Sequence, residues 1–375
     1  MTAFNISVDK LFNGERVFDR QTVWIEDGKI KRIENATSNS RLKSGMLVPG
    51  YIDVQVNGGG GYLFNQNPTV HAIDKIGTAH QRFGTTGWLP TLVTDSVDKM
   101  ERAADAVADA IARKIPGVLG IHFEGPFLSK EKKGVHSESL IREISGKEIS
   151  IITRNDLGKV IVTLAPENVF ESQIRELVSS GIIVCLGHSN ATFGQVNRAL
   201  KAGATGFTHL FNAMSALGSR EPGMVGAALL DQNSYAGLIL DGIHVHPDSA
   251  LLAYKAKSKI MLVTDAMPPV GSDNDSFDFF GDKIERSGLR LTDSAGRLAG
   301  SVLDMNSAVI NAIQMLGINQ SRANNLASKN PACFLGLENQ YGKLKTGYYA
   351  SMILIDNDHH ILACWIDGQE IFNKS

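Results

Sequence analysis

Residues 182–209 read Ile182-Ile-Val-Cys-Leu-Gly-His-Ser-Asn-Ala-Thr-Phe-Gly-Gln-Val-Asn-Arg-Ala-Leu-Lys-Ala-Gly-Ala-Thr-Gly-Phe-Thr-His209, and this stretch decides the fold. Its apolar run Ile182–Leu186 predicts a buried strand, and Gly206–His209 predicts a second one. Between them, Phe193–Ala202 has the apolar spacing of an amphipathic helix. Two strands joined by a helix form a βαβ unit, whose strands run parallel. The stretch therefore predicts an α/β fold with a parallel sheet.

The same alternation extends from about Met46 to Leu344. We expect helices at Val97–Lys114, Glu171–Ser180 and Pro247–Lys255, and further helices after Asn306. We expect eight strands, at Leu47–Val54, Trp88–Val93, Val118–Phe123, Val160–Leu164, Ile182–Leu186, Gly206–His209, Gly237–Leu240 and Ile260–Thr264. Eight parallel strands in a segment of this length predict a (β/α)8 barrel of the TIM type.

The two ends of the chain have a different pattern, typical of short antiparallel strands. Near the N-terminus, Asp27-Gly28 is a hairpin turn between two strand-like runs, and Asp367-Gly368 plays the same part near the C-terminus. We therefore expect residues 1–47 and 346–375 to form one small β-sandwich domain. The barrel is then expected at residues 48–345.

Composition excludes several classes of partner. The 375 residues include 37 Lys and Arg against 39 Asp and Glu, so the net charge is −2 and argues against nucleic acid or an anionic membrane as partner. No apolar run approaches the ~18–20 residues of a membrane span, and the N-terminus lacks a signal-peptide pattern. The three cysteines are far apart, which argues against a disulfide framework. We expect a cytoplasmic protein.

Polar residues follow five of the predicted barrel strands, where barrel active sites form. Burying such groups costs several kcal/mol unless they are paired, so packing alone does not explain their recurrence. In strand order they are Gln55, Glu124, His188, His209 and Asp265.

One carboxylate and two imidazoles, from Glu124, His188 and His209, form the donor set of a catalytic zinc site with an open position for water. A lone histidine is more often a hydrogen-bonded structural residue, but three donors at three strand ends favour a metal. Asp265 can then accept the proton of the attacking water and pass it to the leaving group. Its structural alternative is a helix N-cap. His122 is expected to pack deeper in the barrel.

A series of motifs along the chain resembles one family. They are Pro49-Gly-Tyr-Ile-Asp-Val-Gln-Val-Asn-Gly, His122-Phe-Glu-Gly-Pro-Phe, Lys133-Gly-Val-His, Gly187-His-Ser-Asn-Ala-Thr, Thr208-His-Leu-Phe-Asn-Ala-Met, Arg220-Glu-Pro-Gly, Asp241-Gly-Ile-His-Val and Val263-Thr-Asp-Ala. Together they resemble the N-acetylglucosamine-6-phosphate deacetylases of the amidohydrolase superfamily. The resemblance implies a metal-dependent barrel with a small β-sandwich that converts N-acetyl-D-glucosamine 6-phosphate and water to D-glucosamine 6-phosphate and acetate.

The resemblance also implies roles for single residues. It makes Glu124, His188 and His209 the metal ligands and Asp265 the catalytic aspartate. It gives His136 the role of hydrogen-bonding the amide carbonyl and stabilising the oxyanion; without the resemblance, the sequence favours a solvated loop histidine.

For the phosphate, the resemblance implies Asn212, Ala213, Arg220 and His244, with Arg220 reaching in from the second subunit of a homodimer. Without the resemblance, Arg220 could simply pair with Glu221 on the surface. Leu298-Ala-Gly-Ser301 is similar to a family loop near the sugar, although glycine and serine also form plain turns.

One departure from the superfamily concerns metal number. Many members have His-x-His after the first strand, whereas this chain has Gln55-Val56-Asn57. An amide is a poor substitute for imidazole on zinc, so we expect one divalent metal per subunit, with Gln55 near the attacking water. Zinc is the expected ion, and iron, cobalt or manganese suit the same donors.

Three alternatives stay open at this point. The substrate could be the galactosamine epimer, N-acetylgalactosamine 6-phosphate. The protein could be a cyclic-amide or nucleobase hydrolase, although those usually carry His-x-His. It could also be a non-catalytic amidohydrolase-like binding protein, although such chains are expected to lose ligands that are present here.

Overall fold

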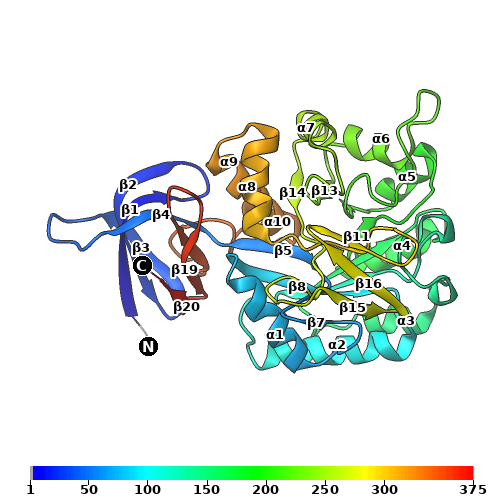
Figure 1. Ribbon diagram of the computed structural model, residues 1–375, viewed down its shortest axis with the longest axis horizontal. Helices are drawn as coiled ribbons and strands as arrows, with labels where there is room; N and C mark the ends of the chain where they lie inside the picture. The colour runs from blue at the N-terminus through cyan, green and yellow to red at the C-terminus, as the bar shows by residue number, and fades with distance from the viewer. Residues whose placement is uncertain (1–2, 375) are drawn as a thin grey trace.

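A computed structural model describes residues 3–374, and Figure 1 shows them as two bodies, a barrel with its helices and a smaller β-domain. The barrel sheet has eight strands, and each pairs in parallel with its neighbours. They are β5 (Tyr51–Val56), β8 (Thr85–Val93), β9 (Gly120–Glu124), β10 (Lys159–Leu164), β11 (Ile183–Leu186), β12 (Gly206–Phe207), β13 (Tyr235–Leu238) and β14 (Ile260–Leu262). A single parallel bridge, Val56 to Ala266, joins the two edges. The predicted TIM-type barrel is confirmed.

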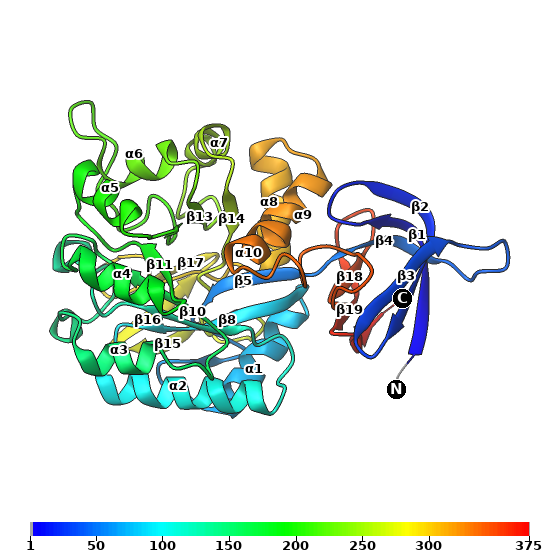
Figure 2. The same ribbon diagram turned by 180° about the vertical axis from the view of Figure 1, so that it is seen from behind.

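Helices surround the barrel in both views, Figure 1 and Figure 2. The helix α5 shows why they form: Thr192 and Gln195 make a capping box at its start, and Val196 and Ala199 bury its apolar face. The helices are α1 (Val70–Gln81), α2 (Val97–Ala112), α3 (Gly146–Ile152), α4 (Glu171–Ser179), α5 (Phe193–Lys201), α6 (Gly223–Leu230), α7 (Pro247–Ala256), α8 (Met305–Leu316), α9 (Gln320–Ala327) and α10 (Lys329–Phe334). Within residues 3–374, no helix has both the length and the apolar character needed to cross a membrane.

The β-domain is built from both ends of the chain, as the sequence predicts. Its strands are β1 (Ala3–Phe12), β2 (Val17–Glu26), β3 (Lys29–Asn35), β4 (Lys43–Pro49), β18 (Met352–Ile355), β19 (Ile361–Ile366) and β20 (Gln369–Asn373). They form one continuous sheet in the order β20-β19-β18-β4-β1-β2-β3. The strand β4 pairs antiparallel with β18, for example Val48 opposite Ile353, and this pairing joins the two ends.

The predicted first barrel strand, Leu47–Val54, is wrong in one respect, because the structure divides it between the two bodies. The strand β4 ends at Pro49 in the β-domain, and β5 begins at Tyr51 in the barrel. Gly50 lies between them, where a Cβ would collide with the Thr86 side chain. Both halves are apolar because Leu47 packs in the β-domain core and Ile52 in the barrel core.

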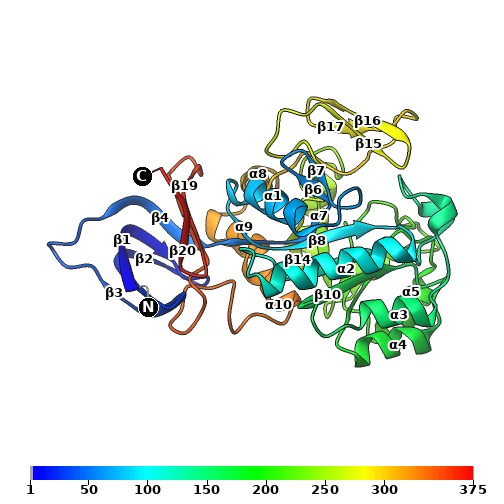
Figure 3. The same ribbon diagram turned by 90° about the horizontal axis from the view of Figure 1, so that it is seen from below.

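A three-stranded antiparallel sheet after β14 was not predicted. It consists of β15 (Ser276–Phe279), β16 (Asp282–Ser287) and β17 (Arg290–Thr292). Figure 3 shows it beside the short hairpin of β6 (Gly58–Gly59) and β7 (Tyr62–Leu63). Phe279 and Leu291 pack there against Leu63 and Met267 in a small apolar cluster. The sheet therefore covers one side of the barrel mouth.

Candidate metal centre and catalytic cavity

A cavity of about 190 Å³ opens at the carboxyl ends of the barrel strands. Phe279, Leu298 and Gly300 form part of its wall, so the unpredicted sheet and the loop after it contribute to the site. Most of the residues that the sequence proposed also line this cavity, namely Glu124, His136, His188, His209, Asn212, Ala213, His244 and Asp265. The barrel thus brings together side chains that lie far apart in the sequence.

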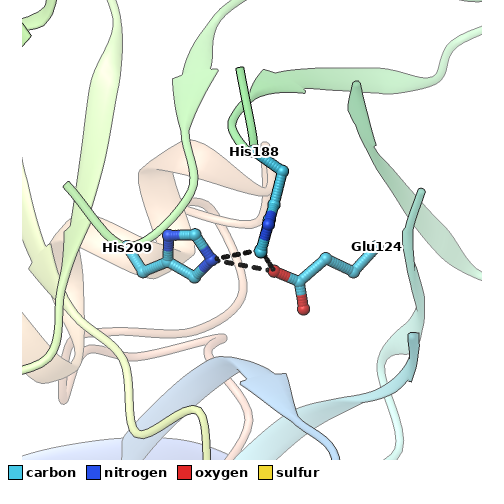
Figure 4. A group of neighbouring side chains, drawn as sticks. All are labelled: Glu124, His188 and His209. Atoms are coloured by element: carbon cyan, nitrogen blue, oxygen red, sulfur yellow. Dashed lines mark hydrogen bonds and ion pairs between the residues drawn. The ribbon is translucent and has the colours of Figure 1, made fainter. Parts of the chain in front are cut away.

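Three donor atoms converge at the base of the cavity (Figure 4). Glu124 Oε1 lies 2.9 Å from His209 Nε2 and 3.2 Å from His188 Nε2, and the two Nε2 atoms are 3.0 Å apart. All three side chains are buried. These atoms are lone-pair donors pointing at one another, which is the arrangement that a shared cation stabilises.

The backbone turns sharply at three of the cavity residues that follow barrel strands. His188, His209 and Asp265 have φ angles of 47°, 35° and 53°. Residues other than glycine seldom adopt this left-handed region, and doing so costs roughly 1–3 kcal/mol each. Such strain is typical of functional sites, where it directs side chains toward a shared point.

The ring of His188 is oriented by a second hydrogen bond. Its Nδ1–H donates to the carbonyl oxygen of Lys132 at 2.9 Å. A proton on Nδ1 leaves the lone pair of Nε2 free to face Glu124 and His209, as in many metal-ligating histidines. His209 Nδ1, by contrast, is buried without a hydrogen-bond partner among the described residues.

Asp265 is held at one of its two carboxylate oxygens. Asn57 Nδ2 donates to Oδ1 at 2.6 Å, and Gln55 Nε2 donates to the same atom at 3.1 Å. Burial raises the pKa of Asp265 to about 6, and the nearby Glu124 carboxylate acts in the same direction. The N-cap alternative does not hold, because the helix that follows Asp265 in the described chain, α8, is capped by Asp304.

Gln55 lies beside both carboxylates. Its Nε2 also approaches the two oxygens of Glu124, each at 3.2 Å. Gln55 is absent from the cavity lining, so its contribution is to hold the Glu124 and Asp265 carboxylates in place. Asn57 does line the cavity, although no sequence pattern marked it as a site residue beyond its place in Gln55-Val56-Asn57.

His136 is buried, so the solvated-loop alternative is wrong. It lies on the loop between β9 and α3 with 3% of its surface exposed, and its ring packs 4.2 Å from that of His188, centroid to centroid. Its Nδ1 lies 2.8 Å from Thr94 Oγ1. Burial and the neighbouring His188 lower the pKa of His136 well below its usual value, which favours the neutral ring.

His244, Asn212 and Ala213 also line the cavity. His244 Nδ1 lies 2.6 Å from Asp241 Oδ2, and Asp241 Oδ1 accepts from the backbone N–H of His244 at 2.8 Å, which fixes the ring. Asn212 donates its backbone N–H to His209 O at 3.0 Å. Ala213, with a φ of 51°, lies directly beside it in the cavity wall.

Arg220 lies outside this cavity in its own chain. It is exposed on the loop between β12 and α6. In residues 3–374 no ion pair joins it to Glu221, whose carboxylate instead accepts the backbone N–H groups of Phe193 and Gly223. The surface-pair alternative is therefore not realised.

His122 lies beneath the metal centre as part of the barrel packing. Its Nε2 is 2.7 Å from Thr163 Oγ1, and its Nδ1 is 3.1 Å from Val54 O. Burial lowers its pKa to about 4. Both ring nitrogens are thus occupied by the barrel interior, which leaves neither for a ligand.

The sequence is similar to known enzymes over most of its length. The amidohydrolase family matches residues 46–373. An N-acetylgalactosamine-6-phosphate deacetylase from Shewanella sp. (strain ANA-3) is 52% identical over 88% of this chain and 84% of its own length. A second N-acetylgalactosamine-6-phosphate deacetylase, from Escherichia coli O157:H7, is 37% identical over 96% of this chain and 97% of its own.

A solved structure of a related enzyme has the same fold. The crystal structure of N-acetylglucosamine-6-phosphate deacetylase from Pasteurella multocida superposes with a TM-score of 0.94 at 33% identity, over 98% of this chain and 99% of that chain. Because the family match and these relatives extend over nearly the whole length, the chain belongs to the amidohydrolase family and, within it, to the amino-sugar-6-phosphate deacetylases.

Proposed function

We propose that this protein hydrolyses the acetamide group of an N-acetyl-D-hexosamine 6-phosphate and releases the free amine and acetate. One observation carries the proposal: the donor atoms of Glu124, His188 and His209 converge in the same cavity as the Asp265 carboxylate. A site that can bind a cation and a group that can move a proton are the two requirements of metal-assisted amide hydrolysis.

The preferred epimer that we propose is N-acetyl-D-galactosamine 6-phosphate. The relative at 52% identity carries that name, whereas the glucosamine deacetylase of known structure is 33% identical. N-acetyl-D-glucosamine 6-phosphate, which the sequence motifs predict, is the second candidate. The two sugars differ only in the orientation of the 4-hydroxyl, so a single contact at the sugar can set the preference.

The donor set fits a divalent metal. Metal–ligand bonds of ~2.0–2.2 Å in a tetrahedron separate the donors by roughly 3.3–3.6 Å, slightly more than the 2.9–3.2 Å found here. Two imidazoles and one carboxylate favour zinc, and iron, cobalt or manganese are compatible with the same set. When bound, such an ion polarises the amide carbonyl and makes a water more acidic. We propose one ion per chain.

Asp265 is the proposed proton carrier, and its free oxygen is the reacting atom. Asn57 and Gln55 both donate to Oδ1, which leaves Oδ2 available. Oδ2 takes the proton of the attacking water and then delivers it to the amide nitrogen as the C–N bond breaks. The products are the amine and acetate, with no net change at the carboxylate.

The remaining cavity residues position the substrate. His136 is proposed to donate a hydrogen bond to the amide oxygen, where negative charge develops. His244 and the Asn212-Ala213 segment are proposed to face the 6-phosphate. Neither lysine nor arginine lines this cavity in the described chain, which supports the proposal that Arg220 of a second copy completes the phosphate site.

The surface around Arg220 supports a homodimer. Leu217 lies on the same loop with 60% of its surface exposed, and Leu230 on α6 and Leu252 on α7 are each 67% exposed. An exposed apolar side chain on the same loop as Arg220 is compatible with the proposed homodimer.

A cytoplasmic location is proposed on the basis of the thiols. All three cysteines, Cys185, Cys333 and Cys364, are unpaired. Unpaired cysteines are typical of reducing compartments.

One experiment tests the proposed function. Metal content is measured on the purified protein, and acetate release is measured with both epimers, each with and without the 6-phosphate. We expect about one metal ion per chain and turnover that requires the phosphate, faster with the galacto epimer. Absence of acetate release from both phosphorylated sugars by metal-loaded protein would refute the deacetylase assignment.

A further inference from the structure

Six apolar side chains line the catalytic cavity beside its polar groups, and the mechanism proposed above gives them no role. They are Val93, Val135, Ile239, Met267, Phe279 and Leu298. Three of them, Val93, Met267 and Phe279, are buried members of the small apolar cluster under the β15–β17 sheet. These three side chains are called the apolar corner of the cavity below.

The apolar corner adjoins two of the reacting groups. Val93 is the register partner of Glu124 where β8 pairs with β9. Met267 follows Asp265 by two residues, and a Cβ at Gly300 would lie only 2.6 Å from Met267 Cγ, so the neighbouring loop packs closely on this side chain. The apolar corner therefore belongs to the part of the wall where the amide bond has to lie during hydrolysis.

The geometry of an acetamide leaves one direction for its methyl group. The acyl carbon carries an oxygen, a nitrogen and a methyl group in one plane. In the proposed function the oxygen faces the metal centre and His136, and the nitrogen faces Asp265, so the methyl group points away from both. A methyl group is most stable where it is removed from water and lies against apolar atoms. The apolar corner offers such a surface beside Glu124 and Asp265.

Phe279 is the member of the apolar corner that can limit its depth. It lies on β15, in the sheet beside the barrel mouth (Figure 3), and not on the barrel itself. The side chain of Gln66, in the loop after β7, donates a hydrogen bond to the carbonyl oxygen of Asp278, which anchors the strand next to Phe279. A phenyl ring is rigid, whereas the Met267 side chain has three rotatable bonds and adapts to its neighbours.

We propose that the apolar corner binds the methyl group of the N-acyl substituent and that Phe279 limits its length, so that the protein accepts an acetyl group and rejects propionyl and longer acyl groups. The inference rests on the proposed function, which supplies the orientation of the amide. Phe279 determines which acyl group fits and has no part in proton transfer.

The test measures kcat/KM for the N-acetyl, N-propionyl and N-butyryl forms of the preferred hexosamine 6-phosphate, by detection of the free amine. One methylene group in an apolar pocket changes kcat/KM by about 10–200-fold, and the unmodified protein should prefer acetyl over propionyl by a factor in this range. Phe279→Ala should reduce that ratio by at least about tenfold, because it opens the end of the pocket. Phe279→Leu, which keeps an apolar side chain, should reduce the ratio less.

Phe277→Ala is the matched control. Phe277 lies two residues earlier on β15, on the same face of the strand, and its half-buried side chain packs against the same apolar cluster. It is not among the residues that line the cavity. Phe277→Ala should therefore weaken the packing of the sheet as Phe279→Ala does, and leave the ratio of acetyl to propionyl hydrolysis unchanged.

The outcomes separate this inference from the proposed function. Equal hydrolysis of acetyl and propionyl by the unmodified protein would overturn the inference, and so would equal changes of the ratio in Phe277→Ala and Phe279→Ala. An equal loss for all three acyl groups in Phe279→Ala would place the ring against the sugar and would also overturn it. If the unmodified protein releases no amine from any of the three, the proposed function fails and the inference fails with it. Hydrolysis of the acetyl sugar with an unchanged ratio in Phe279→Ala would refute the inference alone.

Discussion

The hydrogen bond from Asn57 to Asp265 gives the sharpest prediction about the proposed proton carrier. Asn57 Nδ2 lies 2.6 Å from Asp265 Oδ1, a short contact to a carboxylate. A hydrogen bond to a charged group contributes roughly 1.5–3 kcal/mol, which corresponds to about 10–150-fold in kcat/KM. Gln55 keeps its own bond to the same oxygen at 3.1 Å, so Asn57→Ala should fall in the lower part of that range.

The loss should depend on pH, and its direction follows from the charge. The Asn57 N–H stabilises the ionised carboxylate and so lowers the pKa of Asp265, against the stronger effect of burial that raises it to about 6. Asn57→Ala should raise this pKa further. Because the proposed proton carrier must be ionised to act, the acidic limb of the kcat/KM profile should move to higher pH.

The assay is acetate release from the phosphorylated sugar across pH, together with metal content and circular dichroism. Asn324→Ala is the matched control, since Asn324 is equally buried at 1% exposure but bonds to Pro49 O, away from the cavity. Asn324→Ala should lower the free energy of unfolding without shifting the pH profile of kcat/KM. An Asn57→Ala variant with bound metal and an unchanged profile would refute the anchoring role of Asn57.

Three other predictions follow. Glu124→Ala should abolish both bound metal and turnover, and retention of stoichiometric metal by mass spectrometry would remove Glu124 from the ligand set. Arg220→Ala should lower kcat/KM for the phosphorylated sugar by about 10–150-fold and leave the unphosphorylated sugar little affected; equal effects on both would assign Arg220 to stability. Burial lowers the pKa of Lys257 to about 8, so between pH 8 and its ordinary 10.5 the unfolded chain binds more protons and stability should rise with pH. The free energy of unfolding, measured by urea titration at several pH values, should rise with pH in the unmodified protein and not in Lys257→Met. The same dependence on pH in both proteins would contradict the prediction.

The sequence was most informative where side chains follow strand ends. Glu124, His188, His209 and Asp265 could be brought together from the strand pattern alone, because a parallel barrel places all carboxyl ends at one rim. The same rule could have found Asn57, which lies three residues after the first predicted strand, but a single asparagine is also common in ordinary turns.

Other features had no local signal. The β15–β17 sheet is short and mostly polar, and Phe279 acquires its place in the cavity wall only through packing against Leu63 and Met267. The sequence did not reveal that the first predicted strand is divided at Gly50, because the β-domain core and the barrel core both require apolar residues. The role of Arg220 stays a prediction, since a residue that acts in another chain leaves no mark on the geometry of its own cavity.

The seam that closes the barrel has a consequence for inactivation. At the Val56–Ala266 bridge, backbone hydrogen bonds run from Asp265 N to Gln55 O, at 3.0 Å, and from Asn57 N and Gly58 N to Ala266 O, at 3.0 Å and 2.8 Å. The residues that close the barrel are thus the residues that hold Asp265, the proposed proton carrier. Local opening of a protein usually begins where few hydrogen bonds resist it. A fluctuation that parts this seam would displace Asp265 from Asn57 while the other strands stay paired. Heat should therefore abolish turnover, and expose the amides of Asn57 and Asp265 to hydrogen exchange, before the barrel as a whole melts.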